Sequence, residues 1–128
     1  MIDHTEIVVS DFETSKKFYS AALAPIGIKL ILELPASVTG KTDFAGFGEL
    51  SEAEFWIAQG TPSNPLIHIA FRVSTRSLVD DFYTAAIAAG GRDNGAPGIR
   101  PHYHSNYYAA FVLDLDGNNI EAVCHEAV

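Results

Sequence analysis

The sequence predicts an α+β fold in which one βαβββ unit occurs twice, and the two modules form a curled mixed sheet with helices on its outer face. The main observation is a repeat. Residues 2–27 align without a gap to residues 66–91 at a constant offset of 64, which is half of the 128 residues. Each copy begins with an alternating strand pattern that is followed by an apolar stripe at helical spacing. The element order β-α-β-β-β then repeats.

The first copy is expected to begin with a strand over residues 2–9, whose odd-numbered side chains share the face that packs against the helix. The run Ser10-Asp11-Phe12-Glu13 has the Ser-x-x-Glu pattern of a capping box, which predicts a helix from Asp11. Pro25 and Gly27 end this helix. A loop is expected over residues 36–42, and further strands are expected over residues 28–34, 43–49 and 54–59.

Residues 60–65 are rich in turn formers, so we expect module one at about 1–60, a linker at 61–65 and module two at about 66–128. The second copy is expected to contain a strand at 67–73 and a helix that is capped by Ser74 or Thr75 and ended by Gly90-Gly91. Residues 92–106 are expected to form a weak strand and a long loop. Asp116-Gly117 predicts a hairpin turn between the last two strands, at 107–114 and 119–125.

Composition narrows the possible partners. A formal net charge of −8 and a pI near 4.9 argue against nucleic acid or an anionic membrane, because both require basic surface. No apolar run approaches the roughly 20 residues of a membrane span. The N-terminus runs directly into a strand pattern, so no signal peptide is expected, and Cys124 alone cannot form an intrachain disulfide. A cytoplasmic protein that binds a small molecule or another protein is expected.

Three side chains form a candidate metal site. His4 and His68 occupy equivalent positions of the repeat and point away from the helix layer, so a curled sheet would let them face each other. Glu121 on the last strand projects into the same hollow. Two imidazoles and one carboxylate suit a divalent Fe, Mn, Zn, Ni or Co ion and leave coordination positions open for a substrate. The alternative is that the paired histidines record only the ancestry of the repeat.

Both ends of the chain resemble the vicinal oxygen chelate superfamily. The start reads His-x-x-x-x-Val-Ser-Asp-Phe-x-x-Ser-x-x-Phe-Tyr from His4, and the end reads Phe-Val-Leu-Asp-Leu-Asp-Gly-Asn-Asn-Ile-Glu-Ala from Phe111. The superfamily contains glyoxalase I, bleomycin-resistance proteins, extradiol dioxygenases and fosfomycin-resistance thiol transferases. The resemblance spans the whole chain. It implies a single domain over 1–128, paired βαβββ modules, usually a homodimer, and a divalent metal in the cup.

The resemblance carries the metal ligands over to His4, His68 and Glu121. Glyoxalase I has a fourth ligand, usually glutamate, at the end of its first module. An offset of 64 places that position on Ile57, and a slip of one residue would place it on Trp56. Neither side chain can bind a metal, which weighs against glyoxalase I chemistry. The three remaining ligands resemble those of extradiol dioxygenases and fosfomycin-type transferases, whereas bleomycin-binding relatives lack metal ligands.

Other side chains are candidates for contact with a substrate. Glu6, which stands where the thiol transferases have a threonine, is either a general base or an ion-pair partner of Arg72. The loop before residue 107 is unusually rich in arginine, histidine and tyrosine, and such loops form the mouth of a cup. Trp56 is either a core residue or a platform for the substrate. The candidate substrate-binding residues are Arg72, Arg100, His102, Tyr103, His104, Tyr107 and Ile57.

Two functions follow from this interpretation. The first is a metal-dependent enzyme that binds a small substrate through two adjacent oxygens, with Glu6 and Glu121 as catalytic groups; an isomerase, a lyase or an extradiol-type dioxygenase would fit. The second is a binding protein that sequesters a drug or metabolite without turnover. The metal site is expected either within one chain or across a dimer, since both pairings of modules occur in the superfamily.

Overall fold

The structure, a computed structural model, describes residues 1–128 and contains two βαβββ modules, each with its own four-stranded sheet. The first sheet has the strand order β1 (Thr5–Val9), β4 (Phe55–Gln59), β3 (Phe44–Gly48) and β2 (Lys29–Leu34). The second has the order β5 (His68–Arg72), β8 (Asn119–Cys124), β7 (Tyr108–Leu113) and β6 (Arg92–Ile99). In each sheet the first and last strands of the module pair in parallel, and the other pairs are antiparallel. The predicted α+β class and the two modules are confirmed.

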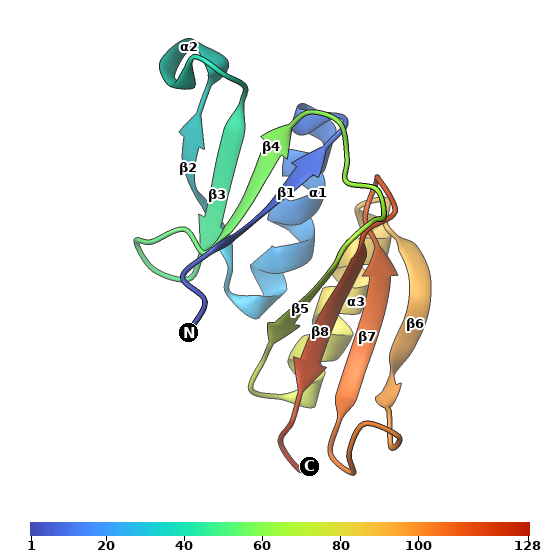
Figure 1. Ribbon diagram of the computed structural model, residues 1–128. Helices are drawn as coiled ribbons and strands as arrows, with labels where there is room; N and C mark the ends of the chain where they lie inside the picture. The colour runs from blue at the N-terminus through green and yellow to red at the C-terminus, as the bar shows by residue number, and fades with distance from the viewer.

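The two sheets stand side by side, with β1 and β5 as the neighbouring edges (Figure 1). Helices α1 (Phe12–Leu23) and α3 (Arg76–Ala88) cover one face of the sheets and pack against each other. The short helices η1 (Ala24–Ile26) and α2 (Ala36–Thr39) complete the elements. The sheets share no strand pairing and do not close into one, so each keeps an open face opposite its helix. No helix is long and apolar enough to cross a membrane.

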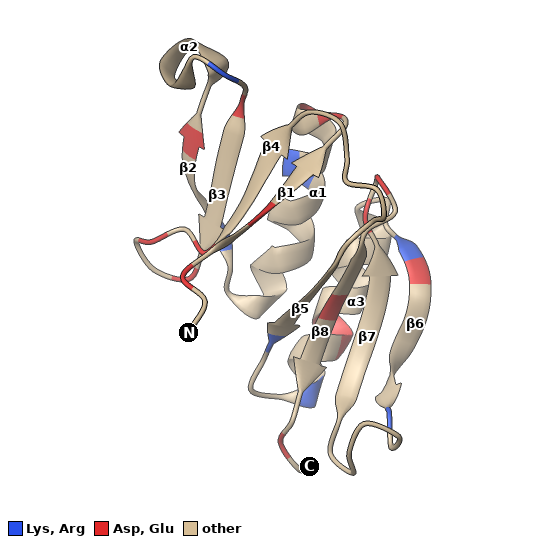
Figure 2. Cartoon of the chain, viewed as in Figure 1, with Lys and Arg blue, Asp and Glu red and all other residues tan.

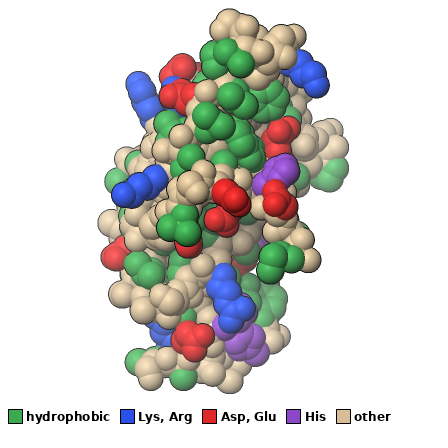
Figure 3. Space-filling view, turned by 90° about the vertical axis from the view of Figure 1, so that its left-hand side faces the viewer, with side chains coloured by type: hydrophobic (Ala, Val, Ile, Leu, Met, Phe, Trp, Pro, Cys, Tyr) green, Lys and Arg blue, Asp and Glu red, His purple; other side chains and the backbone are tan.

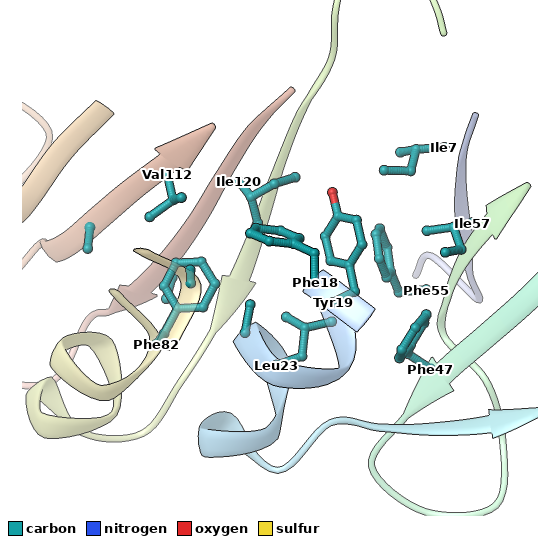
Figure 4. Close-up of a cluster of buried hydrophobic side chains, with 14 of the residues drawn as sticks. Ile7, Phe18, Tyr19, Leu23, Phe47, Phe55, Ile57, Phe82, Val112 and Ile120 are labelled. Carbon is teal, nitrogen blue, oxygen red and sulfur yellow. The ribbon is translucent and has the colours of Figure 1, made fainter. Parts of the chain in front are cut away.

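A single hydrophobic core runs through both modules and includes 20 buried residues. Phe18 and Tyr19 of α1 lie at its centre, with Ile120 of β8 on one side and Phe55 of β4 on the other (Figure 4). As predicted, odd-numbered side chains of the first strands point toward this core, and Ile7 and Val9 of β1 are buried. Burial of these side chains stabilises the pairing of the two modules, because apolar area is removed from water at the α1–α3 contact.

A buried hydrogen-bond network also joins the modules. Asp114, which follows β7 and is 3% exposed, accepts hydrogen bonds from the hydroxyl of Tyr19, the backbone N–H of Asp116 and the backbone N–H of Asn118. Burial raises the pKa of the Tyr19 phenol well above its usual value, and the charge of Asp114 adds to this effect. The Asp-x-Asp-Gly-Asn run near the end of the chain therefore binds the first module, through the hydrogen bond from Tyr19 to Asp114.

Three local predictions differ from the structure. Asp11, rather than Ser10, caps α1, and its side chain accepts from the N–H of Thr14. Ser10 instead donates its hydroxyl to Asp116. A turn of helix, α2, lies in the expected loop. Residues 92–99 form a full strand whose register shifts around Gly95, which has a φ of +147°. This irregularity interrupts the period of two on which a strand is recognised in a sequence.

The last strands of the two modules are related by an offset of 65, not 64. Glu6 pairs with Trp56, whereas Ala70, its equivalent in the repeat, pairs with Glu121. Trp56 is therefore the structural counterpart of Glu121. The slip of one residue that would place this position on Trp56 is confirmed, and the equivalence of Ile57 at an offset of 64 was wrong. Ile57 is fully buried in the core rather than placed to touch a substrate.

Candidate metal and substrate site

The open face of the second module carries an imidazole and a carboxylate in contact. The Nε2 atom of His68 lies 3.0 Å from the Oε1 atom of Glu121. These side chains come from the parallel neighbours β5 and β8, and Glu121 is the one acidic residue of β8, midway along the strand (Figure 2). The carboxylate is 2% exposed, whereas the imidazole is 47% exposed. A carboxylate this deeply buried requires polar partners, because burial of an unpaired charge is costly.

The second oxygen of Glu121 is also engaged. The hydroxyl of Tyr107 donates a hydrogen bond to Oε2, and burial together with this acceptor raises the pKa of the phenol. The ring of Phe111 lies in the same sheet and stacks beside His68 at 6.2 Å between centroids. Glu121 therefore holds a fixed orientation, with one oxygen toward His68 and the other toward Tyr107.

A histidine pair lies beside Tyr107. The Nε2 atom of His104 is 2.6 Å from the Nδ1 atom of His125, and the two rings stack at 4.9 Å. The Nδ1 atom of His104 accepts the backbone N–H of Asn106, so Nε2 carries the proton when the ring is neutral and donates it to His125. The pair thereby links the loop before β7 to the segment after β8.

A pocket of about 270 Å³ opens on the same module. Arg100 folds back over β6 and donates hydrogen bonds to the carbonyl oxygens of Gly98 and Ala96, with its guanidinium 5.3 Å from the centre of the Phe111 ring. Because two carbonyls accept from this guanidinium, its position is fixed beside the pocket. The lining residues are Asn94, Gly95, Arg100, His102, Tyr103, Phe111 and Asn119. The pocket combines one cation with aromatic surface, so an anionic or aromatic group would fit it.

The open face of the first module has a different character. His4 and Glu6 line a pocket of about 230 Å³ together with Trp56, whose ring lies against Gly46. The remaining lining residues are Leu34, Thr39 and Phe44. Hydrophobic side chains gather on the upper part of the face that β2 and α2 present (Figure 3), where Leu32 and Val38 are exposed. The pocket of the first module thus combines apolar side chains with His4 and Glu6, whereas Glu121 of the second module contacts the polar groups of His68 and Tyr107.

Some predicted relationships are not formed within one chain. No group of three or more His, Cys, Asp or Glu side chains is close enough to hold one metal ion, so His4 does not join His68 and Glu121. The expected ion pair between Glu6 and Arg72 is also absent. Arg72 instead lines a cleft of about 370 Å³ between the modules. The two histidines belong to neighbouring sheets that do not close on each other, which explains their separation.

Sequence reasoning missed three residues of this site. His125 was placed at the end of the last strand without a role, and Phe111 and Asn119 were assigned only to their strands. The alternation of side chains along the strands could have indicated both His125 and Phe111. Phe111 of β7 pairs with Glu121, and His125 lies four residues after Glu121, so both are in phase with it. Trp56, for which the sequence allows either a core role or a substrate platform, lies on the open face.

The family is established by comparison with known proteins. Residues 1–122 match the model of the Glyoxalase/Bleomycin resistance protein/Dioxygenase superfamily. The chain belongs to this superfamily, as the motifs at its two ends suggested. A search of curated proteins found no match.

Several solved structures share the fold. A glyoxalase/bleomycin resistance protein from Albidiferax ferrireducens T118 is 27% identical, with a TM-score of 0.76, and the alignment covers 97% of this chain and 98% of that one. The E144Q mutant of glyoxalase I from Zea mays is 24% identical, with a TM-score of 0.72 over 95% of this chain, which spans 46% of the maize protein. The E126Q mutant of the fosfomycin resistance protein FosX from Listeria monocytogenes, complexed with Mn(II) and 1S,2S-dihydroxypropylphosphonic acid, is 15% identical. Its TM-score is 0.70, and the alignment covers 100% of this chain and 91% of FosX.

Proposed function

We propose that this protein is a divalent-metal-dependent enzyme that acts on a small substrate bound through two adjacent oxygens. The observation that carries the proposal is the contact between His68 Nε2 and Glu121 Oε1 at 3.0 Å. Two ligand atoms on one ion, each about 2.1 Å from it and at a right angle, lie roughly 3 Å apart. A neutral imidazole and a buried carboxylate are the donors that Mn, Fe, Zn, Co and Ni accept.

The third ligand is His4, supplied by a second copy of the chain. His4 is more than half exposed beside Asp3 and has no partner among the other proposed ligands. In a homodimer the open face of one first module would cover the open face of the partner's second module. Such pairing would complete two equivalent sites and would remove the exposed apolar surface around Leu32 and Val38 from water.

The chain's own residues divide the remaining tasks. The bound metal would polarise the two substrate oxygens as a Lewis acid. Glu6, on the same face as His4, is placed to accept a proton at that side of the site. Arg100, His102 and Tyr103 would hold an anionic or aromatic part of the substrate in their pocket. Lyase, isomerase or extradiol-type dioxygenase chemistry would fit this proposed site.

Mixing two inactive variants tests the proposal. His4→Ala and Glu121→Ala dimers should each bind no Mn(II) at the site. When the two proteins are unfolded, mixed in equal amounts and refolded, half of the dimers are mixed, and each holds one intact site and one doubly mutated site. Mn(II) binding should therefore return to roughly one quarter of the wild-type capacity. Capacity that stays at zero in the mixture would refute a shared site, and full binding by either variant would refute its ligand.

The alternative is a non-catalytic binding protein of the bleomycin-resistance type. One observation favours it: Trp56 and its apolar neighbours occupy the place where the second module has Glu121, the proposed metal ligand. Because Trp56 is the only tryptophan, its fluorescence reports directly on an aromatic ligand. Binding of such a ligand by metal-free protein, with equal affinity in Glu121→Ala, would support this alternative over the enzyme.

A further inference from the structure

We propose that Tyr107 is a positioning residue that holds Glu121 as a one-oxygen metal ligand. The inference rests on the proposed function, because it concerns how the carboxylate of Glu121 is oriented to bind the proposed metal ion. The two oxygens of Glu121 have different partners: Oε1 faces His68 Nε2, and Oε2 accepts the hydrogen bond from the hydroxyl of Tyr107. An ion shared with His68 is therefore offered Oε1 alone.

The position of Tyr107 is fixed by the rings around it. His104 and His125 contact it edge to face, at 5.4 Å and 5.3 Å between centroids, and Tyr103 lies at 4.7 Å. The hydrogen bond between His104 and His125 ties two of these rings together. Three rings from the loop before β7 and from the end of β8 therefore enclose the phenol. The enclosure holds the hydroxyl on Glu121 with little loss of side-chain entropy at the moment of binding.

The division of the two oxygens has a consequence for the substrate. A carboxylate that binds through both oxygens occupies two coordination positions, and one that binds through a single oxygen occupies one. Holding Oε2 on Tyr107 leaves one more position for the two adjacent oxygens of a substrate. Partners of this kind orient ligands in many metal sites, and their removal typically weakens metal affinity by about 10–100-fold.

Tyr107→Phe tests the inference, with Tyr108→Phe as the matched control. Tyr108 is the next residue and donates its hydroxyl to Asp80, away from Glu121. The measurements are the Mn(II) dissociation constant and the number of waters on the bound ion, from the relaxation of water protons. Tyr107→Phe should raise the dissociation constant roughly tenfold, because Glu121 loses the partner that orients it. It should also remove one bound water, because both oxygens of Glu121 become free to bind. Tyr108→Phe should change neither quantity.

The outcomes separate the two proposals. Wild-type protein that binds no Mn(II) would overturn the proposed function and this inference with it. Wild-type protein that binds Mn(II), together with an unchanged water count in Tyr107→Phe, would overturn the inference alone. His125→Ala removes one of the enclosing rings but keeps the phenol, so it should lower the water count in part. If Tyr107→Phe does not fold, an unchanged water count in His125→Ala overturns the inference.

Discussion

Trp56 occupies in the first module the position that Glu121 occupies in the second. In the parallel strand pairs, Trp56 lies opposite Glu6 and Glu121 lies opposite Ala70, and Glu6 and Ala70 are equivalent positions of the repeat. The first module thus presents an indole where the second presents a carboxylate. Its ring is accommodated because Gly46 opposite it has no side chain: a Cβ there would lie 2.9 Å from the indole. The repeat keeps its histidines but replaces one potential ligand by an aromatic surface.

Trp56→Glu should therefore create a fourth ligand. In the proposed dimer the new carboxylate would face the shared ion from the side of His4. The added negative charge should lower the Mn(II) dissociation constant by about tenfold or more, since ligand charge is a main determinant of affinity. Calorimetric titration measures this effect. Trp56→Gln introduces a side chain of the same shape as glutamate but without the charge, so it should give a much smaller gain in affinity. Equal affinities for the two variants would contradict the placement of Trp56 at the metal.

The hydroxyl of Tyr19 should contribute measurably to stability. Tyr19→Phe leaves the buried carboxylate of Asp114 without one of its donors, while the aromatic packing of the ring is retained. The free energy of unfolding should fall by about 1–3 kcal/mol, because an acceptor stays buried with one partner missing. Urea unfolding measures the difference. Tyr103→Phe, at a tyrosine that is 58% exposed, should stay within about 0.5 kcal/mol of the wild type.

The same phenol makes stability sensitive to alkaline pH. The pKa of Tyr19 is raised in the folded protein, whereas an unfolded tyrosine titrates near 10. Its contribution is fully present below about pH 10 and is lost as the pH rises above this value, at up to about 1.4 kcal/mol per pH unit. The gap in stability between wild type and Tyr19→Phe should therefore narrow between pH 9 and 11. A gap that stays constant or widens over this range would show that the buried phenol ionises as freely as an exposed one.

Much of the fold could be predicted from two patterns in the sequence. The repeat indicates two equivalent modules, and the alternation of side chains indicates the strands and their core-facing residues. The helix-facing residues of β1 and the hairpin at Asp116-Gly117 follow from local pattern and turn chemistry. The cap of α1 was predicted wrongly because Ser10 and Asp11 both suit a cap, and the choice depends on Asp116, more than 100 residues away, which binds Ser10. Such long-range competition leaves no trace in the local sequence.

The candidate site was predictable in part. His68 and Glu121 were paired from their strand phase, and the structure places them in contact. Ile57 was included because the offset of 64 was carried past the first helices, but the second module has one more residue before its last strand, so the offset becomes 65. The contact between His104 and His125 joins a loop to a strand end, and no periodicity relates such segments. The proposed completion of the site by His4 of a second copy cannot be read from one chain.

Gly27 and Gly91 are equivalent in the repeat, yet glycine is favoured at each for a different reason. Gly27 ends η1 with a φ of +83° and has open space around it. Gly91 has no left-handed φ, but a Cβ there would lie 2.5 Å from Val112 and 2.9 Å from Phe18. Gly27→Asn should therefore change the free energy of unfolding by less than about 1 kcal/mol, because asparagine adopts the left-handed conformation readily.

Gly91→Asn should lower the free energy of unfolding by about 3 kcal/mol or more, since the side chain must displace Val112 or Phe18 from the core between α1 and β7. Gly91→Ala, with a single added carbon, should lower it by about 1–3 kcal/mol. Urea unfolding of the three variants measures these differences. Suppose that Gly27→Asn and Gly91→Asn lower the free energy of unfolding equally. The close packing at Gly91 would then relax at little cost, and one backbone constraint shared by both copies would govern both positions.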